Sequence, residues 1–197
     1  MPRNPNETRQ RLRSAALELF AENGFDQTTA AQIAARAGLT ERTFFRHFPS
    51  KPDVLFDGQT MLVKALKTSI AQAPANLSPV EILRLALVSL VDIFEQNRQF
   101  SEPRQRIIAA TPALQEKERE KAAVLARTMT DALRHRGVSH QRAKLAGQIG
   151  LTVLSEALEM WFAAPQSKLM DCIDAALSEL RDLTWPGDRH RSDASPR

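Results

Sequence analysis

Two arginines that lie one helical turn apart, Arg42 and Arg46, have side chains suited to contact DNA. An arginine fork can donate two hydrogen bonds to the O6 and N7 atoms of one guanine, or it can hold a phosphate. Glu41 can accept a hydrogen bond from cytosine N4, and the methyl group of Thr43 can contact a thymine methyl. Glu41 fits equally well as a first-turn acid that faces the positive end of a helix dipole. These residues indicate double-stranded DNA as a partner and leave open which arginine contacts a base.

Groups that could perform catalysis or bind a metal show no comparable clustering. The seven glycines form no phosphate-binding loop, and no serine has the surroundings of a nucleophile. The single cysteine, Cys172, excludes an intramolecular disulfide and a cysteine-based zinc cluster. Metal-binding spacing is also lacking among the four histidines, His47, His135, His140 and His190. We therefore predict no catalytic residue, no metal site and no cofactor, and we expect that the chain is not an enzyme.

The elements that must position the two arginines are two short helices joined by a glycine turn. Thr29 is suited to cap the first helix, and Gln32 three residues later completes a capping box. Gly38 can adopt the left-handed conformation that ends this helix. Thr40 then caps a second helix over residues 41–47. A helix, a tight turn and a second helix form the arrangement that places the second helix in the major groove.

Three segments around this motif resemble the N-terminal domain of the tetracycline-repressor (TetR) family of bacterial transcriptional regulators. They read AALELFAENGFDQTT, QIAARAGLT and TFFRHFPSKPDVLF. The resemblance implies an all-α homodimer that binds a palindromic operator through its N-terminal domain. It also implies a C-terminal domain that binds a small molecule and thereby releases DNA, most often as a repressor.

Contacts with the DNA backbone are the next expectation from this resemblance. It assigns them to Thr29, Thr43, His47 and Lys51. Physical reasoning agrees for Thr29 and adds Ser50, because both stand at expected helix starts, where amides and hydroxyls meet phosphates. Lys51 contributes a positive charge. His47 can alternatively pack beside Phe48, and the resemblance favours the phosphate contact.

Three phenylalanines on the second short helix have different expected roles. Phe44 and Phe48 fit the apolar core, where they lock this helix against the first helix of the chain. Phe45 occupies the position that in the family usually holds a phosphate-bonding tyrosine, so the hydroxyl contact is missing here. We expect Arg46 to take over part of that affinity.

Composition agrees with a globular helical protein. Hydrophobic residues make up 43% and charged residues 25%, and the 197 residues include no tyrosine. The net charge of +4 is concentrated in residues 1–51, which hold eight basic and five acidic side chains. No apolar stretch is long enough for a signal core or a membrane span, so we expect a cytoplasmic protein without a membrane partner. A helical adaptor that binds acidic proteins is the main alternative function, and an enzyme is the weaker one.

The chain divides into three expected regions. Residues 1–50 form a helix-turn-helix DNA-binding domain, residues 51–187 form a helical effector-binding and dimerisation domain, and residues 188–197 form a disordered tail. The pattern of caps and prolines predicts about nine helices and no strand. One of these helices is expected to run from Lys51 to Ala73 and another from Ser78 to Asn97.

The two last long helices, at 139–164 and 167–183, are predicted to form a four-helix interface between two copies of the chain. Gly147 and Gly150 allow close approach of another helix on the first of them. The alternative is that these glycines only accommodate a neighbour within the same chain.

A cavity for the effector is expected among the middle helices. Arg104 and Arg106 can meet an acidic head group, or they can be ordinary surface charges. The segments 104–108, 111–114 and 157–161 resemble the C-terminal domain of regulators related to the mycofactocin-system regulator, which implies a long apolar effector such as an acyl-CoA. Each apolar candidate on its own is more often simply a core residue. The apolar side chains predicted to line the cavity are Met61, Leu62, Leu90, Phe94, Ile107, Met129, Trp161 and Phe162.

Overall fold

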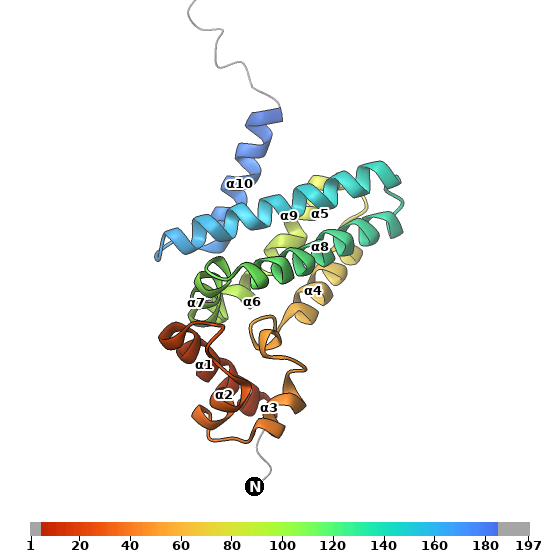
Figure 1. Ribbon diagram of the computed structural model, residues 1–197. Helices are drawn as coiled ribbons and strands as arrows, with labels where there is room; N and C mark the ends of the chain where they lie inside the picture. The colour runs from red at the N-terminus through yellow and green to blue at the C-terminus, as the bar shows by residue number, and fades with distance from the viewer. Residues whose placement is uncertain (1–4, 185–197) are drawn as a thin grey trace, which may run out of the picture. The chain divides into compact units, whose positions relative to one another are not determined.

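The computed structural model describes residues 5–184, and all regular structure there is helical, which confirms the predicted all-α class (Figure 1). No helix in this range is long and apolar enough to cross a membrane. The elements are α1 (Pro5–Asn23), α2 (Ala30–Arg36), α3 (Glu41–His47), the 3-10 helix η1 (Lys51–Val54), α4 (Gln59–Gln72), α5 (Pro79–Val88), α6 (Val91–Gln96), α7 (Arg98–Ala109), α8 (Pro112–His135), α9 (His140–Ala163) and α10 (Leu169–Thr184).

Two predicted helices are each divided in the structure, so residues 5–184 hold ten α-helices and one 3-10 helix, close to the predicted count of about nine. The expected helix from Ser78 to Asn97 ends at Val88, because the hydroxyl of Ser89 donates to the Ala86 carbonyl at 2.6 Å and competes with the helical pattern. The expected helix from Lys51 to Ala73 is η1 followed by α4. Gly58, with a φ of +99°, adopts a left-handed conformation that separates the two.

Packing divides the chain into two compact units. The head unit contains residues 5–64 and 92–124, and the C-terminal unit contains residues 65–91 and 125–184. The predicted domain boundary after residue 50 does not coincide with a boundary of packing, because α6, α7 and the first half of α8 belong with the N-terminal helices. The predicted tail lies outside the described residues.

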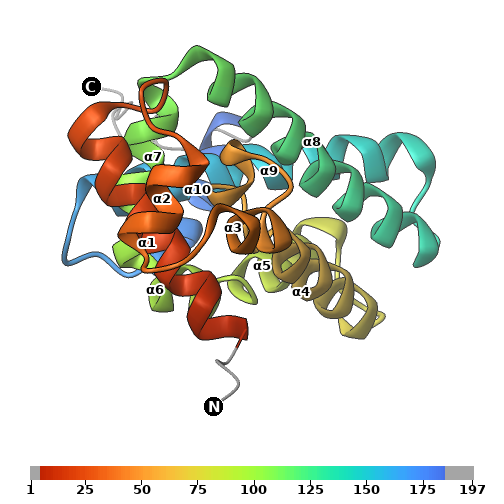
Figure 2. The ribbon, with the colours of Figure 1, turned by 60° about the horizontal axis from the view of Figure 1, so that its bottom comes forward.

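The head unit is built around one apolar cluster. In Figure 2, α1, α2 and α3 lie side by side, and both α2 and α7 contact α1. Leu12, Ile33 and Phe44, from three different helices, are fully buried. Ile108 from α7 and Leu114 from α8 belong to the same cluster, so the core of the head includes segments distant in sequence.

The C-terminal unit is held together by contacts among α5, α9 and α10. Arg84 of α5 forms a two-pronged ion pair with Asp174 of α10, with both N–O distances at 2.7 Å. The side chains of Trp161 and Ile173 are buried in the core of this unit.

Gly147 and Gly150 lie against other helices of the same chain. A Cβ atom at Gly147 would come within 2.6 Å of the Ala126 carbonyl oxygen in α8, and one at Gly150 within 2.8 Å of the Met129 sulfur. The prediction that these glycines serve an interface between two copies is therefore wrong. The alternative of an internal neighbour is confirmed.

Candidate nucleic-acid interface

The turn between α2 and α3 is determined by local hydrogen bonds. Thr29 caps α2 and forms the predicted capping box with Gln32, whose backbone N–H donates to the threonine hydroxyl at 3.2 Å. Gly38 has a φ of +65°, and the Leu39 N–H donates to the Ala34 carbonyl at 2.8 Å. This closes α2 and reverses the chain before α3 begins.

One face of α3 is buried in the head unit. Phe44 and Phe48 have exposed fractions of 0% and 1%, and their ring centres lie 5.6 Å apart, which confirms their predicted place in the core. The guanidinium of Arg9 in α1 lies 4.8 Å from the centre of the Phe48 ring. These contacts hold α3 against α1 and fix the direction of its other face.

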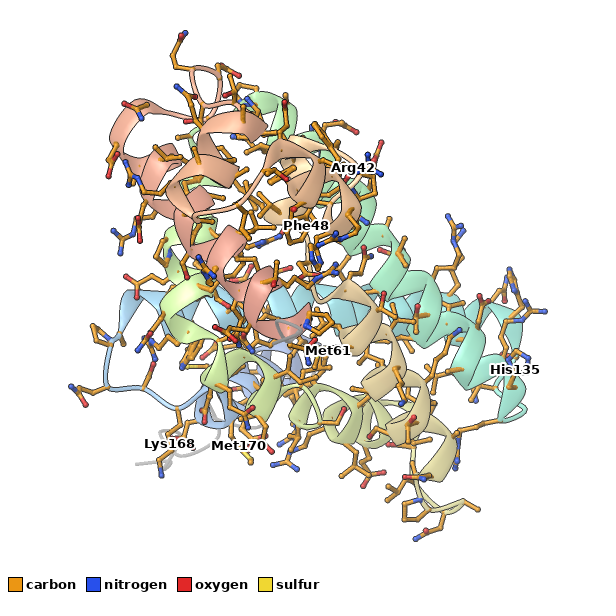
Figure 3. All side chains as sticks on the ribbon, turned by 90° about the horizontal axis from the view of Figure 1, so that it is seen from below. Arg42, Phe48, Met61, His135, Lys168 and Met170 are labelled. Atoms are coloured by element: carbon orange, nitrogen blue, oxygen red, sulfur yellow. The ribbon has the colours of Figure 1, made fainter. Side chains whose placement is uncertain are left out.

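The opposite face of α3 carries Glu41, Arg42 and Arg46, all exposed, and Phe45, which is 48% exposed. Figure 3 shows Arg42 at the margin of the head unit and Phe48 among its packed side chains. Within the described residues neither arginine of α3 forms an ion pair or a hydrogen bond. This face offers two unoccupied guanidinium groups to an external partner.

The remaining polar residues of α3 are partly occupied. The hydroxyls of Thr43 and Thr40 are 3.0 Å apart, and Thr40 caps the helix. His47 is half-buried, and its pKa is lowered by burial and by the positive charges of Arg46 and Arg9, with Asp57 opposing the shift. At neutral pH the imidazole is therefore mostly uncharged and can donate one N–H.

Lys51 and Ser50 point toward partners within the head unit that sequence reasoning missed. The Lys51 ammonium donates to the main-chain carbonyls of Phe25 and Thr28, both at 2.8 Å. Burial lowers its pKa. The Ser50 hydroxyl donates to Asp53 at 2.6 Å, and the same carboxylate accepts from Lys117 of α8 at 2.7 Å. Both residues thus fasten η1 to neighbouring segments.

The predicted effector-lining residues fall into both compact units. In the head unit Met61 is 58% exposed, and Leu62, Phe94 and Ile107 are half-buried. A hollow of about 500 Å³ in this unit brings Ile107 and Arg106 together with the turn after α1. In the C-terminal unit Leu90, Met129 and Trp161 are buried, and Phe162 is half-buried.

The two arginines predicted to meet an acidic head group already have carboxylate partners. Arg104 pairs with Glu118 at 2.5 Å and also donates to the Leu55 carbonyl. Arg106 pairs with Glu102 one turn away on α7. No group of three or more histidine, cysteine or acidic side chains in residues 5–184 could hold a metal ion.

Two family models match the chain. Residues 12–57 match the model of bacterial regulatory proteins of the tetR family, and residues 77–184 match the model of the MftR C-terminal domain.

Curated relatives share shorter stretches. The transcriptional regulator TcmR of Streptomyces glaucescens is 37% identical over 76 residues, which are 39% of this chain and 34% of TcmR. The putative mycofactocin biosynthesis regulator MftR of Mycobacterium tuberculosis is 28% identical over 113 residues, 57% of each chain. The chain thus spans between about a third and somewhat over half of these relatives.

Solved structures match over nearly the whole chain. The repressor FadR of Thermus thermophilus, in complex with lauroyl-CoA, is 26% identical with a TM-score of 0.57, and 96% of this chain and 99% of FadR are covered. The structure of a putative TetR-family regulator from Syntrophomonas wolfei has a TM-score of 0.66 at 21% identity, and the match covers 91% of this chain and 96% of that one. At this low identity the match shows only that the two chains share a fold.

Proposed function

Since this chain belongs to the tetR family of bacterial regulatory proteins, we propose that it represses transcription by binding a palindromic operator as a homodimer. A small apolar or amphipathic effector then releases the operator. The two unoccupied arginines on the exposed face of α3 carry this proposal.

The contrast with other arginines of the head unit makes that observation informative. Arg36 on α2 is also exposed, yet its guanidinium bonds Glu18 and Glu22 at 3.2 and 2.8 Å. Arg42 and Arg46 are left without such neutralisation on a helix whose other face is locked. A pair of free, oriented guanidinium groups suits base edges and phosphates in a major groove.

The backbone contacts proposed around α3 are those of Thr29, Thr43 and His47. Lys51 joins them through its third N–H, because two of its three donors are used by carbonyl groups inside the head. Phe45 brings an exposed ring without a hydroxyl, so it contributes apolar contact with the groove instead of a phosphate bond.

Dimerisation through α9 and α10 supplies the second recognition helix. Leu145 on α9 is 63% exposed and Leu183 on α10 is 81% exposed, which leaves apolar surface on both helices. Two half-sites in successive major grooves lie about 34–36 Å apart, so a two-fold dimer must present its recognition helices at that spacing.

The proposed effector is acyl-CoA-like or another amphipathic molecule. The support is the MftR-type C-terminal region and the lauroyl-CoA bound to the similar FadR structure. Release requires that the effector bind the DNA-incompetent state more tightly than the operator-bound state. Operator DNA must then weaken effector binding by the same factor.

Three measurements on the purified chain test this proposal. Selection from random duplexes must yield a palindrome, and log affinity for it must fall steeply with log salt concentration. Sedimentation velocity at micromolar concentration must show a dimer. Titration of lauroyl-CoA or dodecanoate must reduce operator affinity. Equal binding of all sequences would favour the adaptor alternative, and a monomer or an unaffected operator complex would remove the corresponding part of the proposal.

A further inference from the structure

One arginine of the head unit is partly buried and lacks a carboxylate partner. Arg13 lies in the middle of α1, and its guanidinium carbon is 3.7 Å from the centre of the Phe100 ring in α7. Its Nε atom is buried without a hydrogen-bond partner, and none of the ion pairs found in residues 5–184 includes Arg13.

The charges around Arg13 leave it unneutralised. Arg9, one turn earlier on α1, is held by Asp57 at 2.7 Å. Arg104, one turn after Phe100 on α7, is held by Glu118 at 2.5 Å. Each neighbouring arginine therefore has its own acid, and Arg13 is the surplus positive charge where α1 faces α7.

The surroundings also make this charge costly to maintain. The pKa of Arg13 is lowered by burial, and the positive charges of Arg9 and Arg104 lower it further against the opposing effect of Asp57. A partly desolvated cation is stabilised when an anion reaches it, because the anion restores both charge balance and hydrogen bonds.

We propose that Arg13 is the anion-binding group of a ligand site between α1 and α7, and that it takes the carboxylate or phosphate of an amphipathic ligand. The ring of Phe100 covers one face of the guanidinium, and no hydrogen bond or ion pair within residues 5–184 uses its N–H donors. A planar fork of this kind matches two oxygens of a carboxylate or a phosphate. The assignment replaces Arg104 and Arg106, whose forks are directed to Glu118 and Glu102.

This inference rests on the proposed effector and gives it a direct route to the DNA-binding head. Arg13 shares α1 with Leu12, which is fully buried in the core of the head. It also shares α1 with Arg9, whose guanidinium lies over Phe48 behind the recognition helix. An anion bound at Arg13 thus acts on the helix that supports α3.

The test compares three ligands with one chain length: decanoate, decyl phosphate and decan-1-ol. Calorimetric titration of the unmodified protein is expected to give affinities for one or both anions at least about tenfold above the alcohol, since charged hydrogen bonds are the stronger class. Arg13→Gln should remove that preference and leave the affinity for the alcohol unchanged. Arg106→Gln lies on α7, the other helix of the proposed site, and its guanidinium is already paired with Glu102, so this variant is the matched control and should keep the preference.

Arg13→Lys serves as a second variant that keeps the charge and loses the fork, so the preference should fall only partly. Operator affinity and the melting temperature are measured for every variant to confirm a folded head. If Arg13→Gln retains the full preference for the anions while decanoate still releases the operator, the inference fails and the proposed function stands. If none of the three ligands binds the unmodified protein, the inference fails, and the operator measurements report on repression separately.

Discussion

The ammonium group of Lys51 lies 4.1 Å from the centre of the Phe25 ring and donates to the main-chain carbonyl of the same residue at 2.8 Å. Phe25 belongs to the turn between α1 and α2, whereas Lys51 begins η1 directly after the recognition helix. One side chain therefore ties both ends of the DNA-reading motif together.

Replacing Lys51 by methionine should destabilise the chain before it affects DNA contacts. The variant keeps the apolar stem, loses two charged hydrogen bonds, and should cost about 1–3 kcal/mol of unfolding free energy. Urea unfolding of the purified protein measures this change. Lys67→Met, on the exposed side of α4, is the control, and an equal effect of both substitutions would contradict the structural role of Lys51.

Arg42→Ala and Arg46→Ala should each weaken specific operator binding while leaving the melting temperature unchanged. If the replaced arginine bonds a guanine, its loss should cost about 1–3 kcal/mol of binding free energy and relax selectivity at one base pair. If the replaced arginine bonds a phosphate, its loss should weaken binding to all sequences alike. It should also reduce the slope of log affinity against log salt concentration by about one unit. Arg36→Ala is the control, because its guanidinium is already paired with two glutamates. Fluorescence anisotropy over a salt series with single-base operator variants separates the two outcomes.

Phe45→Tyr should strengthen DNA binding without a change in selectivity. The ring is 48% exposed and packs edge-on against Phe44 with centres 5.4 Å apart, so a hydroxyl adds a phosphate donor without disturbing the core. A single such bond contributes about 0.5–1.5 kcal/mol. Affinities for operator and unrelated duplex, measured in parallel, should rise together, and a gain confined to the operator would point to a base contact instead.

Gly147→Ala should destabilise the chain more than Gly150→Ala. The new Cβ at Gly147 would meet a backbone carbonyl oxygen, which cannot move aside, at 2.6 Å. At Gly150 the nearest atom is the flexible Met129 sulfur at 2.8 Å. Overpacking costs about 1–3 kcal/mol, and alanine returns up to about 1 kcal/mol of helix propensity, so the second variant should be nearly neutral. The denaturant midpoints of the two variants measure this difference. A lower midpoint for Gly150→Ala than for Gly147→Ala would show that α8 can move away from α9 at Gly147.

Stability should decline as the pH falls through the titration of His47. Its folded pKa lies below the ordinary 6.5, so the unfolded chain takes up the proton more readily. The contribution of His47 to the free energy of unfolding is complete above about pH 6.5. It is lost as the pH falls toward the lower pKa that His47 has in the folded chain. The difference between unfolding free energies of the unmodified chain and His47→Gln, followed from pH 8 to pH 5, isolates this residue. A difference that stays constant over that range would exclude the shift.

Features set by neighbouring residues were predictable from sequence. The capping box at Thr29 and the left-handed Gly38 follow from contacts within five positions, and the structure contains both. Lys51 and its carbonyl partners are 23 and 26 residues apart, and no periodic pattern encodes such a bond. The sequence also did not indicate which helix packs against Gly147. A glycine indicates that another helix can approach closely, but it does not identify that helix.

The apolar cluster of the head, completed by Ile108 and Leu114, has a consequence for anyone who recombines regulators of this kind. A fragment cut after position 50 would lack both side chains and expose the pockets that they fill. A chimaera that transplants this head onto a foreign sensor therefore has to carry residues 92–124 along with residues 1–64, with junctions at three positions rather than one.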